Sequence, residues 1–202
     1  MDHVRYFLGA FHVVVLPPGL LFWFVIHPWA RGWRRLGPTR TYLIVLPALT
    51  ALASILFRVR GRLLGADLGM NWNLILIALI LFTVMTWLEF QYWRELSIPT
   101  LIGIPELSLP EHRKGKLLKD GAYRLVRHPR YLSAGIGVIA NALVINHVGM
   151  YVLILLLFPA GFVMLIFEER DLVERFGEEY RQYQSEVPQI IPRFRKGRTT
   201  VR

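Results

Sequence analysis

The sequence contains no cysteine. It therefore has no disulfide framework, no thiolate zinc site and no cysteine nucleophile. Acidic residues are also few: 14 Asp and Glu stand against 24 Lys and Arg, which gives a formal net charge of +10. In a soluble protein this excess would suggest nucleic acid as a partner. In a membrane protein it reflects topology and contact with anionic lipid headgroups.

Charged residues make up only 19% of the 202 residues, and long stretches have none at all. Asp, Glu, Lys and Arg are absent from residues 6–30, 41–57, 68–88 and 131–167. These runs have the length of membrane spans, whereas the helices of a soluble bundle carry charges on their outward faces. The composition therefore excludes a soluble enzyme and predicts an all-α integral membrane protein without a nucleic-acid partner.

The last uncharged run is interrupted at residues 146–149, Asn-His-Val-Gly, which predicts a hairpin turn. We therefore expect a polytopic protein with five transmembrane helices, the last two forming a tight hairpin. Residues 1–202 would form a single membrane domain, with a three-helix N-terminal part over 1–93 and a catalytic part over 94–202. The catalytic part divides into a connector (94–130), the helical hairpin (131–167) and a C-terminal helix and tail (168–202).

The distribution of Lys and Arg predicts the orientation of these helices. With five crossings, 20 of the 24 Lys and Arg lie on the side of the C-terminus. The positive-inside rule then places the N-terminus outside and the C-terminus in the cytoplasm. Leu172, Phe176, Tyr180 and Tyr183 recur at helical spacing, so we expect a cytoplasmic amphipathic helix that continues out of the fifth span. The basic end at 193–202 is expected to contact membrane lipids.

A basic segment stands immediately before the fourth span, where Arg127 and His128 precede Pro129. Proline suits the first turn of a helix and biases the residue before it toward an extended conformation. Arg127 and His128 would thus lie at a helix N-terminus, where free N–H groups and the helix dipole favour an anion. A carboxylate or phosphate is the expected ligand.

Two carboxylates, Glu168 and Glu169, are the first charges after the apolar hairpin. The hairpin returns them to the membrane face that holds Arg127 and His128. The four side chains would then form a site suited to a zwitterion. On spacing alone, a purely interfacial role, with arginine reaching lipid headgroups and glutamate starting a solvated helix, is an equally good interpretation.

The stretch from 117 to about 194 resembles the integral-membrane methyltransferase superfamily that includes isoprenylcysteine carboxyl methyltransferases and phosphatidylethanolamine N-methyltransferases. The resemblance is carried by G-A-Y-R-L-V-R-H-P-R-Y at 121–131, E-E-R-D-L at 168–172, F-G-E-E-Y-R-Q-Y at 176–183 and V-P-Q-I-I-P at 187–192. It implies methyl transfer from S-adenosylmethionine, with S-adenosylhomocysteine as product, at the cytoplasmic face. Arg127 or His128 would hold the cofactor carboxylate, and Glu168 or Glu169 its ammonium or ribose hydroxyls.

The resemblance and the spacing together nominate a set of site residues and no metal ligands. Cofactor-binding candidates are Gly121, Tyr123, Arg127, His128, Pro129, Tyr131, Gly135, Glu168, Glu169 and Tyr180. Glu89, Asn141 and Glu169 are the candidates for catalytic roles, Glu89 because a carboxylate at the membrane boundary is a functional candidate. Ser133, Gly137 and Asn141 share one face of the fourth span and are expected to let it pack closely on the fifth.

The acceptor stays open at this point. A lipid or lipophilic acceptor of the isoprenylcysteine type is the first expectation, with a phospholipid amine or a small thiol as alternatives. Eukaryotic isoprenylcysteine enzymes carry an arginine one turn before the glutamate pair, where this chain has Met164. A non-enzymatic membrane protein that has lost cofactor binding is the remaining interpretation, and it differs in predicting that Ala at the four charged positions affects stability alone.

Overall fold

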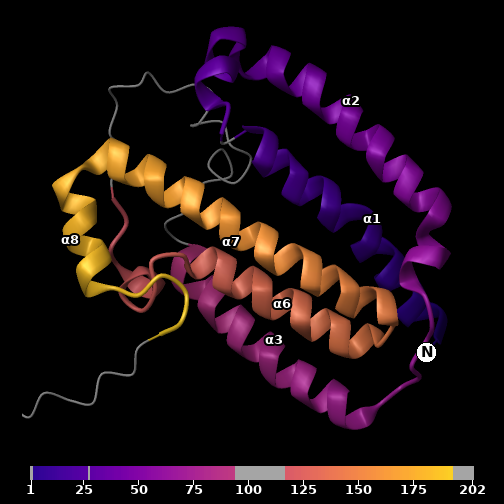
Figure 1. Ribbon diagram of the computed structural model, residues 1–202. Coiled ribbons are helices and arrows are strands. Elements are labelled where there is room, and N and C mark those ends of the chain that lie inside the picture. The colour runs from indigo at the N-terminus through magenta and orange to yellow at the C-terminus, as the bar shows by residue number, and fades with distance from the viewer. Residues whose placement is uncertain (1, 27, 94–116, 193–202) are drawn as a thin grey trace, which may run out of the picture.

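The computed structural model describes residues 2–26, 28–93 and 117–192 of the chain (Figure 1). The described elements are α1 (Asp2–Ile26), α2 (Ala30–Leu64), α3 (Trp72–Trp93), the short 3-10 helix η1 (Gly121–Arg124), α6 (Pro129–Ile145), α7 (Val148–Phe176) and α8 (Glu178–Glu186). Apart from an isolated bridge between Asp67 and His147, these residues form no β-structure. The predicted connector over 94–116 and the basic end at 193–202 lie outside the described residues.

Four of the described helices, α1, α2, α3 and α7, are long and apolar enough to cross a membrane. The fifth expected span, α6, is also apolar but has only 17 residues. At about 1.5 Å per residue it reaches about 25 Å, less than the roughly 30 Å of a bilayer core. The all-helical, polytopic class is therefore supported, and the five-span count stays a prediction.

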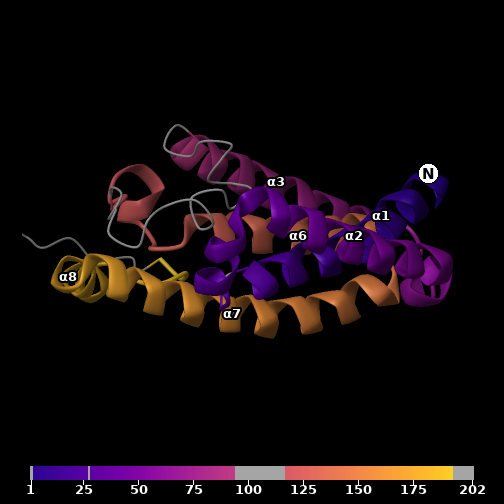
Figure 2. The same ribbon diagram turned by 90° about the horizontal axis from the view of Figure 1, so that it is seen from above.

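The long helices lie side by side in the order α2, α1, α7, α6 and α3, with α8 and η1 at one end (Figure 1). Figure 2 shows α3 and α7 on opposite sides of α6. The largest buried apolar cluster joins α1, the end of α2 and the α6–α7 hairpin; its members are Ala10, Val13, Leu64, Ala142, Ile145, Met150 and Leu153. Many other apolar side chains are exposed, as expected of helices that face lipid.

The predicted hairpin turn is confirmed. Helix α6 ends at Asn146, which has left-handed backbone angles (φ 49°, ψ 50°), and α7 begins two residues later. Gly149 then allows a close approach to α2, because a Cβ added there would lie 1.9 Å from the carbonyl oxygen of Leu63.

A buried polar cluster ties three segments together at this end of the molecule. Arg5 of α1 is only 3% exposed, and its Nε donates to the carbonyl of Ile145 at 3.0 Å. Its guanidinium also pairs with Asp67 of the α2–α3 loop and donates to the carbonyl of Asn146. His147 lies beside Asp67, with Nδ1 3.8 Å from its carboxylate oxygen. The cluster holds the N-terminus of α1 and the α2–α3 loop against the α6–α7 turn.

Helix α2 extends beyond the uncharged run 41–57: it continues to Leu64 through three arginines, and it bends at Gly37, whose φ is 76°. The structure differs from the sequence-based expectations in two places. The C-terminal helix is separated from α7 at Gly177 (φ 61°) and so is not a continuous extension of it. The expectation that the small face of α6 packs on the fifth span is wrong: Gly137 meets Met85 of α3, and Ser133 bonds to Tyr92 of α3.

Candidate functional site

The site is built at the N-terminus of α6. Pro129 occupies the first turn, and His128 precedes the helix with non-helical angles (φ −123°, ψ 64°), as the sequence predicts. The proline lacks an N–H that would have no partner there, so the helix begins at this point with one unpaired donor fewer. His128 is 4% exposed, and both Arg127 and His128 contact Glu169 in the C-terminal part of α7.

An ion pair between Arg127 and Glu169 is the centre of the site. Arg127 Nε lies 2.8 Å and Nη2 lies 2.6 Å from Glu169 Oε1. Both side chains are largely buried, with 10% of the arginine and 15% of the glutamate side chain exposed. The sequence predicts that this helix N-terminus holds an anion, and the anion found there is the carboxylate of the chain itself.

The second oxygen and the remaining faces of the Glu169 carboxylate are also occupied. His128 Nε2 lies 3.1 Å from Oε1, and Gln184 Nε2 of α8 donates to Oε2 at 3.1 Å. The Tyr180 hydroxyl donates to Oε1 at a longer 3.5 Å. Glu168 differs from its neighbour, since 29% of its side chain is exposed and its carboxylate is 3.8 Å from His128 Nδ1.

The C-terminal segment is fastened to the same corner by main-chain bonds. The Arg127 N–H donates to the carbonyl of Pro188 at 2.8 Å, and the His128 N–H donates to that of Gln189 at 3.1 Å. Arg127 Nη1 donates to the carbonyls of Gln184 and Val187. Sequence reasoning did not assign these four positions, although Gln184 adjoins one quoted motif and the other three fall in V-P-Q-I-I-P.

Two buried tyrosines of α8 pack beneath this segment. Their rings lie 5.9 Å apart, and the Tyr183 hydroxyl donates to the carbonyl of Tyr123. Burial raises the pKa of both Tyr180 and Tyr183, and the nearby Glu169 carboxylate raises that of Tyr180 further. Both phenols therefore remain protonated donors at neutral pH.

Three further predicted residues serve the fold around the site. Gly121 has a φ of 58°, and a Cβ added there would lie 2.7 Å from the carbonyl oxygen of Gln91, so glycine is required where η1 meets α3. The Tyr131 ring packs edge-on against His128 with centroids 5.8 Å apart. Gly135 instead faces α7, because its added Cβ would lie 3.5 Å from Phe158.

The structure brings together Arg127, His128, Glu168, Glu169 and Tyr180, but two catalytic candidates stay apart from them. The Asn141 amide donates to the carbonyl of Gly137 in its own helix at 2.8 Å. Asn141 lies 13 residues along α6 from His128, about 20 Å at the helical rise. Glu89 is half-buried on α3, and among the described residues it makes no hydrogen bond or ion pair with the cluster.

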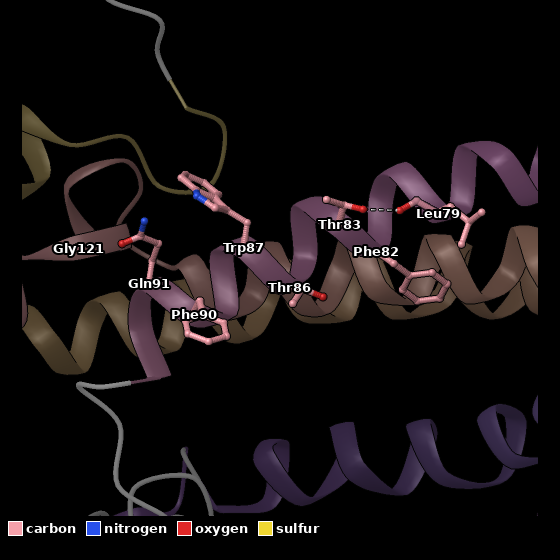
Figure 3. A pocket seen from close by; sticks show the side chains of 8 residues that line it. All are labelled: Leu79, Phe82, Thr83, Thr86, Trp87, Phe90, Gln91 and Gly121. Carbon is pink, nitrogen blue, oxygen red and sulfur yellow. Dashed lines mark hydrogen bonds between the residues drawn. The ribbon is translucent and has the colours of Figure 1, made fainter.

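An open groove of about 920 Å³ follows α3 toward the same end of the molecule (Figure 3). Its lining consists of apolar and aromatic side chains with two threonines and a glutamine: Leu79, Phe82, Thr83, Thr86, Trp87, Phe90 and Gln91, together with Gly121. Figure 3 shows the Gln91 side chain turned toward Gly121. The groove therefore begins on a membrane-length helix and ends at η1, six residues before Arg127.

Three known proteins are similar to part of this chain. Methanethiol S-methyltransferase 1 of Bradyrhizobium diazoefficiens is 40% identical over 76 residues, which are 35% of this chain and 24% of that protein. Protein-S-isoprenylcysteine O-methyltransferase of Schizosaccharomyces pombe is 35% identical over 77 residues, or 38% and 33% of the two chains. Methanethiol S-methyltransferase of Pseudomonas deceptionensis is 29% identical over 148 residues, or 69% and 48%.

The chain spans between about a quarter and a half of the length of these relatives. No solved structure matches it significantly. The family model described as phospholipid methyltransferase matches residues 73–179, from α3 to the start of α8, which is more than half of the chain and includes both charged pairs. This protein therefore belongs to the phospholipid methyltransferase family.

Proposed function

We propose that the protein is a membrane methyltransferase that uses S-adenosylmethionine at the corner formed by α6, α7 and α8. The observation that carries this proposal is the assembly of Arg127, His128, Glu168 and Glu169 into one partly buried charged cluster. A merely interfacial role would leave these charges in water at separate points. The family membership and the methyltransferase relatives support the same activity.

The residues present fit this cofactor by their chemistry. When bound, S-adenosylmethionine supplies an electrophilic methyl group on a positively charged sulfur. Glu168, partly exposed and beside buried His128, offers a carboxylate to a positive group. Tyr131, half-buried with its ring against the same histidine, offers an aromatic face that suits the adenine or the sulfonium, whereas Tyr180 is buried against Glu169.

The remaining residues of the site would act by positioning. Methyl transfer needs the nucleophile, the methyl carbon and the sulfur in line and water excluded, with little demand for covalent chemistry. Arg127 and Glu169 bind α7, α8 and residues 187–189 to one corner, so they fix the walls of the site. A catalytic part for Glu169, Glu89 or Asn141 remains a prediction, as does cofactor contact by Gly121, Tyr123, Pro129 and Gly135.

The groove along α3 favours a lipophilic acceptor. Its apolar lining lies on a helix that is long enough to span the membrane, and its polar end at Gln91 adjoins η1. An acceptor with an apolar chain would therefore approach from the lipid with its reactive end toward the charged cluster. The relative named for isoprenylcysteine supports this class. Two relatives are named for methanethiol, so a small thiol is the second candidate.

The proposed topology has five spans, with α6 as the short fourth member, the N-terminus outside and the site at the cytoplasmic face. Its support is the excess of Lys and Arg on the side of the C-terminus. The contacts between α6, α7 and α8 support treating residues 94–202 as the catalytic part of one membrane domain.

Calorimetric titration of the detergent-purified protein with S-adenosylhomocysteine tests the activity class, because the product cannot turn over. We expect saturable one-site binding that is lost in a folded double variant Glu168→Ala, Glu169→Ala, because without Glu169 the walls of the site are no longer held by Arg127 and Gln184. Glu174→Ala on the same helix is the matched control and should bind normally. Absence of binding by folded, lipid-supplemented wild-type protein would refute the proposal and favour a non-enzymatic membrane protein.

The acceptor is tested separately by transfer of a labelled methyl group to lipid extracts, prenylated peptides and methanethiol in competition. A bulky substitution in the groove, Thr86→Trp, should raise the KM for a chain-bearing acceptor. It should leave the KM for methanethiol unchanged. An equal effect on both acceptors would contradict the assignment of the groove.

A further inference from the structure

The two glutamates of the site differ in what remains free to bind a ligand. Glu169 accepts from Arg127, His128, Tyr180 and Gln184, and only 15% of its side chain is exposed. Side chains of the protein thus already bind both oxygens of this carboxylate, with Arg127, His128 and Tyr180 at Oε1 and Gln184 at Oε2. The Glu168 side chain is 29% exposed, and its carboxylate lies 3.8 Å from Nδ1 of His128. That distance is too long for a hydrogen bond.

Arg127 is committed in the same way as Glu169. Its Nε and Nη2 point to the Glu169 carboxylate, and Nη1 donates to the carbonyls of Gln184 and Val187. The guanidinium therefore offers little to an incoming anion. The charges of Arg127 and Glu169 also cancel each other, whereas Glu168 is partly exposed and can present its negative charge to a ligand.

S-adenosylmethionine carries two positive groups, and this arrangement distinguishes them. Its amino-acid end bears a carboxylate beside the ammonium, so seating that end at Glu168 would bring two carboxylates together, and Arg127 is already paired with Glu169. The sulfonium is a positive charge without a counter-charge of its own. Because like charges in close proximity repel strongly in a partly buried site, the sulfonium is the better partner for Glu168.

On the basis of the proposed function, we propose that Glu168 contacts the sulfonium and makes the site selective for the methyl donor over its product. In the transfer, the acceptor lone pair forms the new bond to the methyl carbon, and the electron pair of the broken S–C bond stays on sulfur. The sulfonium thereby becomes a neutral thioether. Glu168 then loses its charged partner, which favours release of the product.

Glu168→Gln tests this assignment, because it keeps the size of the side chain and removes its charge. We expect the affinity for S-adenosylmethionine to fall about tenfold, as for the loss of one charge-assisted contact. The affinity for S-adenosylhomocysteine should change less than about twofold on the same reasoning, since that contact is absent from the product complex. Both are measured by calorimetry on the full-length protein without an acceptor.

Glu174→Gln is the matched control, since it removes the same charge from an exposed position farther along α7. It should leave both affinities unchanged. Circular dichroism and size-exclusion chromatography check the fold of each variant, and Glu168→Asp provides a second variant that keeps the charge and should retain most of the selectivity.

The outcomes separate the two proposals. Equal weakening of both ligands by Glu168→Gln would mean that Glu168 meets a group they share, and it would overturn the sulfonium assignment while leaving the methyltransferase proposal standing. Unchanged affinity for both would also overturn the assignment. Wild-type protein that binds neither ligand would overturn both proposals.

Discussion

The buried Arg5 at the start of α1 provides the sharpest test of how this fold is held together. It lies far from the charged corner, at the opposite end of the α6–α7 hairpin, and it joins three segments that the family model covers only in part. Replacing it with methionine keeps the unbranched stem of the side chain and removes its hydrogen bonds and its charge. We expect the protein to fold but to lose stability.

The size of the loss follows from the individual contacts. The bond to the buried carbonyl of Ile145 involves a charged donor and contributes about 1.5 to 3 kcal/mol. The pair with Asp67 adds about 0.5 to 1 kcal/mol, because 39% of the aspartate side chain is exposed and solvent screens the charges. Ile145 keeps a contact with His147 Nδ1 at 3.0 Å, which moderates the cost. The total is about 2 to 3 kcal/mol.

Thermal unfolding in detergent, followed by circular dichroism, measures this effect. For a chain of this size each kcal/mol corresponds to about 2 to 4 °C, so Arg5→Met should lower the Tm by about 4 to 12 °C. Arg58→Met makes the same chemical change at an exposed position of α2 and should cost less than about 0.5 kcal/mol. If the two variants lose the same stability, the cluster does not hold the segments together.

Three further predictions follow from other parts of the molecule. The pKa of Asp67 is lowered by the N–H of Gly69 and by Arg5, against the opposing effect of partial burial. The stability that this carboxylate contributes is therefore present above its ordinary pKa of about 3.9 and is lost as the pH falls through the lowered pKa. The variant Asp67→Asn should abolish that acid-dependent part of the Tm profile. Gly121→Ala forces a Cβ against Gln91 at a positive φ and should cost about 1 to 3 kcal/mol, measured by the same melts; an unchanged Tm would contradict the close contact. Because burial raises the pKa of Tyr183, ultraviolet titration should show a phenol that ionises well above the ordinary tyrosine pKa of about 10. This late-ionising phenol should be missing from Tyr183→Phe. Ionisation of Tyr183 near its ordinary pKa would argue against its burial.

Features that depend on neighbouring residues were predictable from the sequence. Uncharged runs locate the apolar helices because a helix without charges has no outward face suited to water. The turn at 146–149 and the start of α6 at Pro129 also follow from local conformational preferences. The uncharged run 41–57 does not mark the end of α2, because arginine is a good helix former and the helix continues with Arg60 lying over the Phe57 ring.

Features that depend on packing between distant segments were not predictable in this way. The small face of α6 meets α3 because helix order in space, which one periodic pattern does not encode, decides which neighbour approaches Gly137. Likewise, a charge pattern does not show that Arg5 is buried, since the carbonyls and the carboxylate that satisfy it lie more than sixty residues away.

The same distinction between local sequence and distant packing applies to the candidate site. The sequence alone determined that Arg127 and His128 and the glutamate pair return to one end of a hairpin, because an apolar hairpin of two helices brings its ends together. Only the tertiary structure decided that the Glu169 carboxylate is bound by Arg127, His128 and Gln184, whereas Glu168 stays partly exposed. Adjacent residues on a helix differ by about 100° in direction, so which of the two faces the protein depends on what packs against the helix.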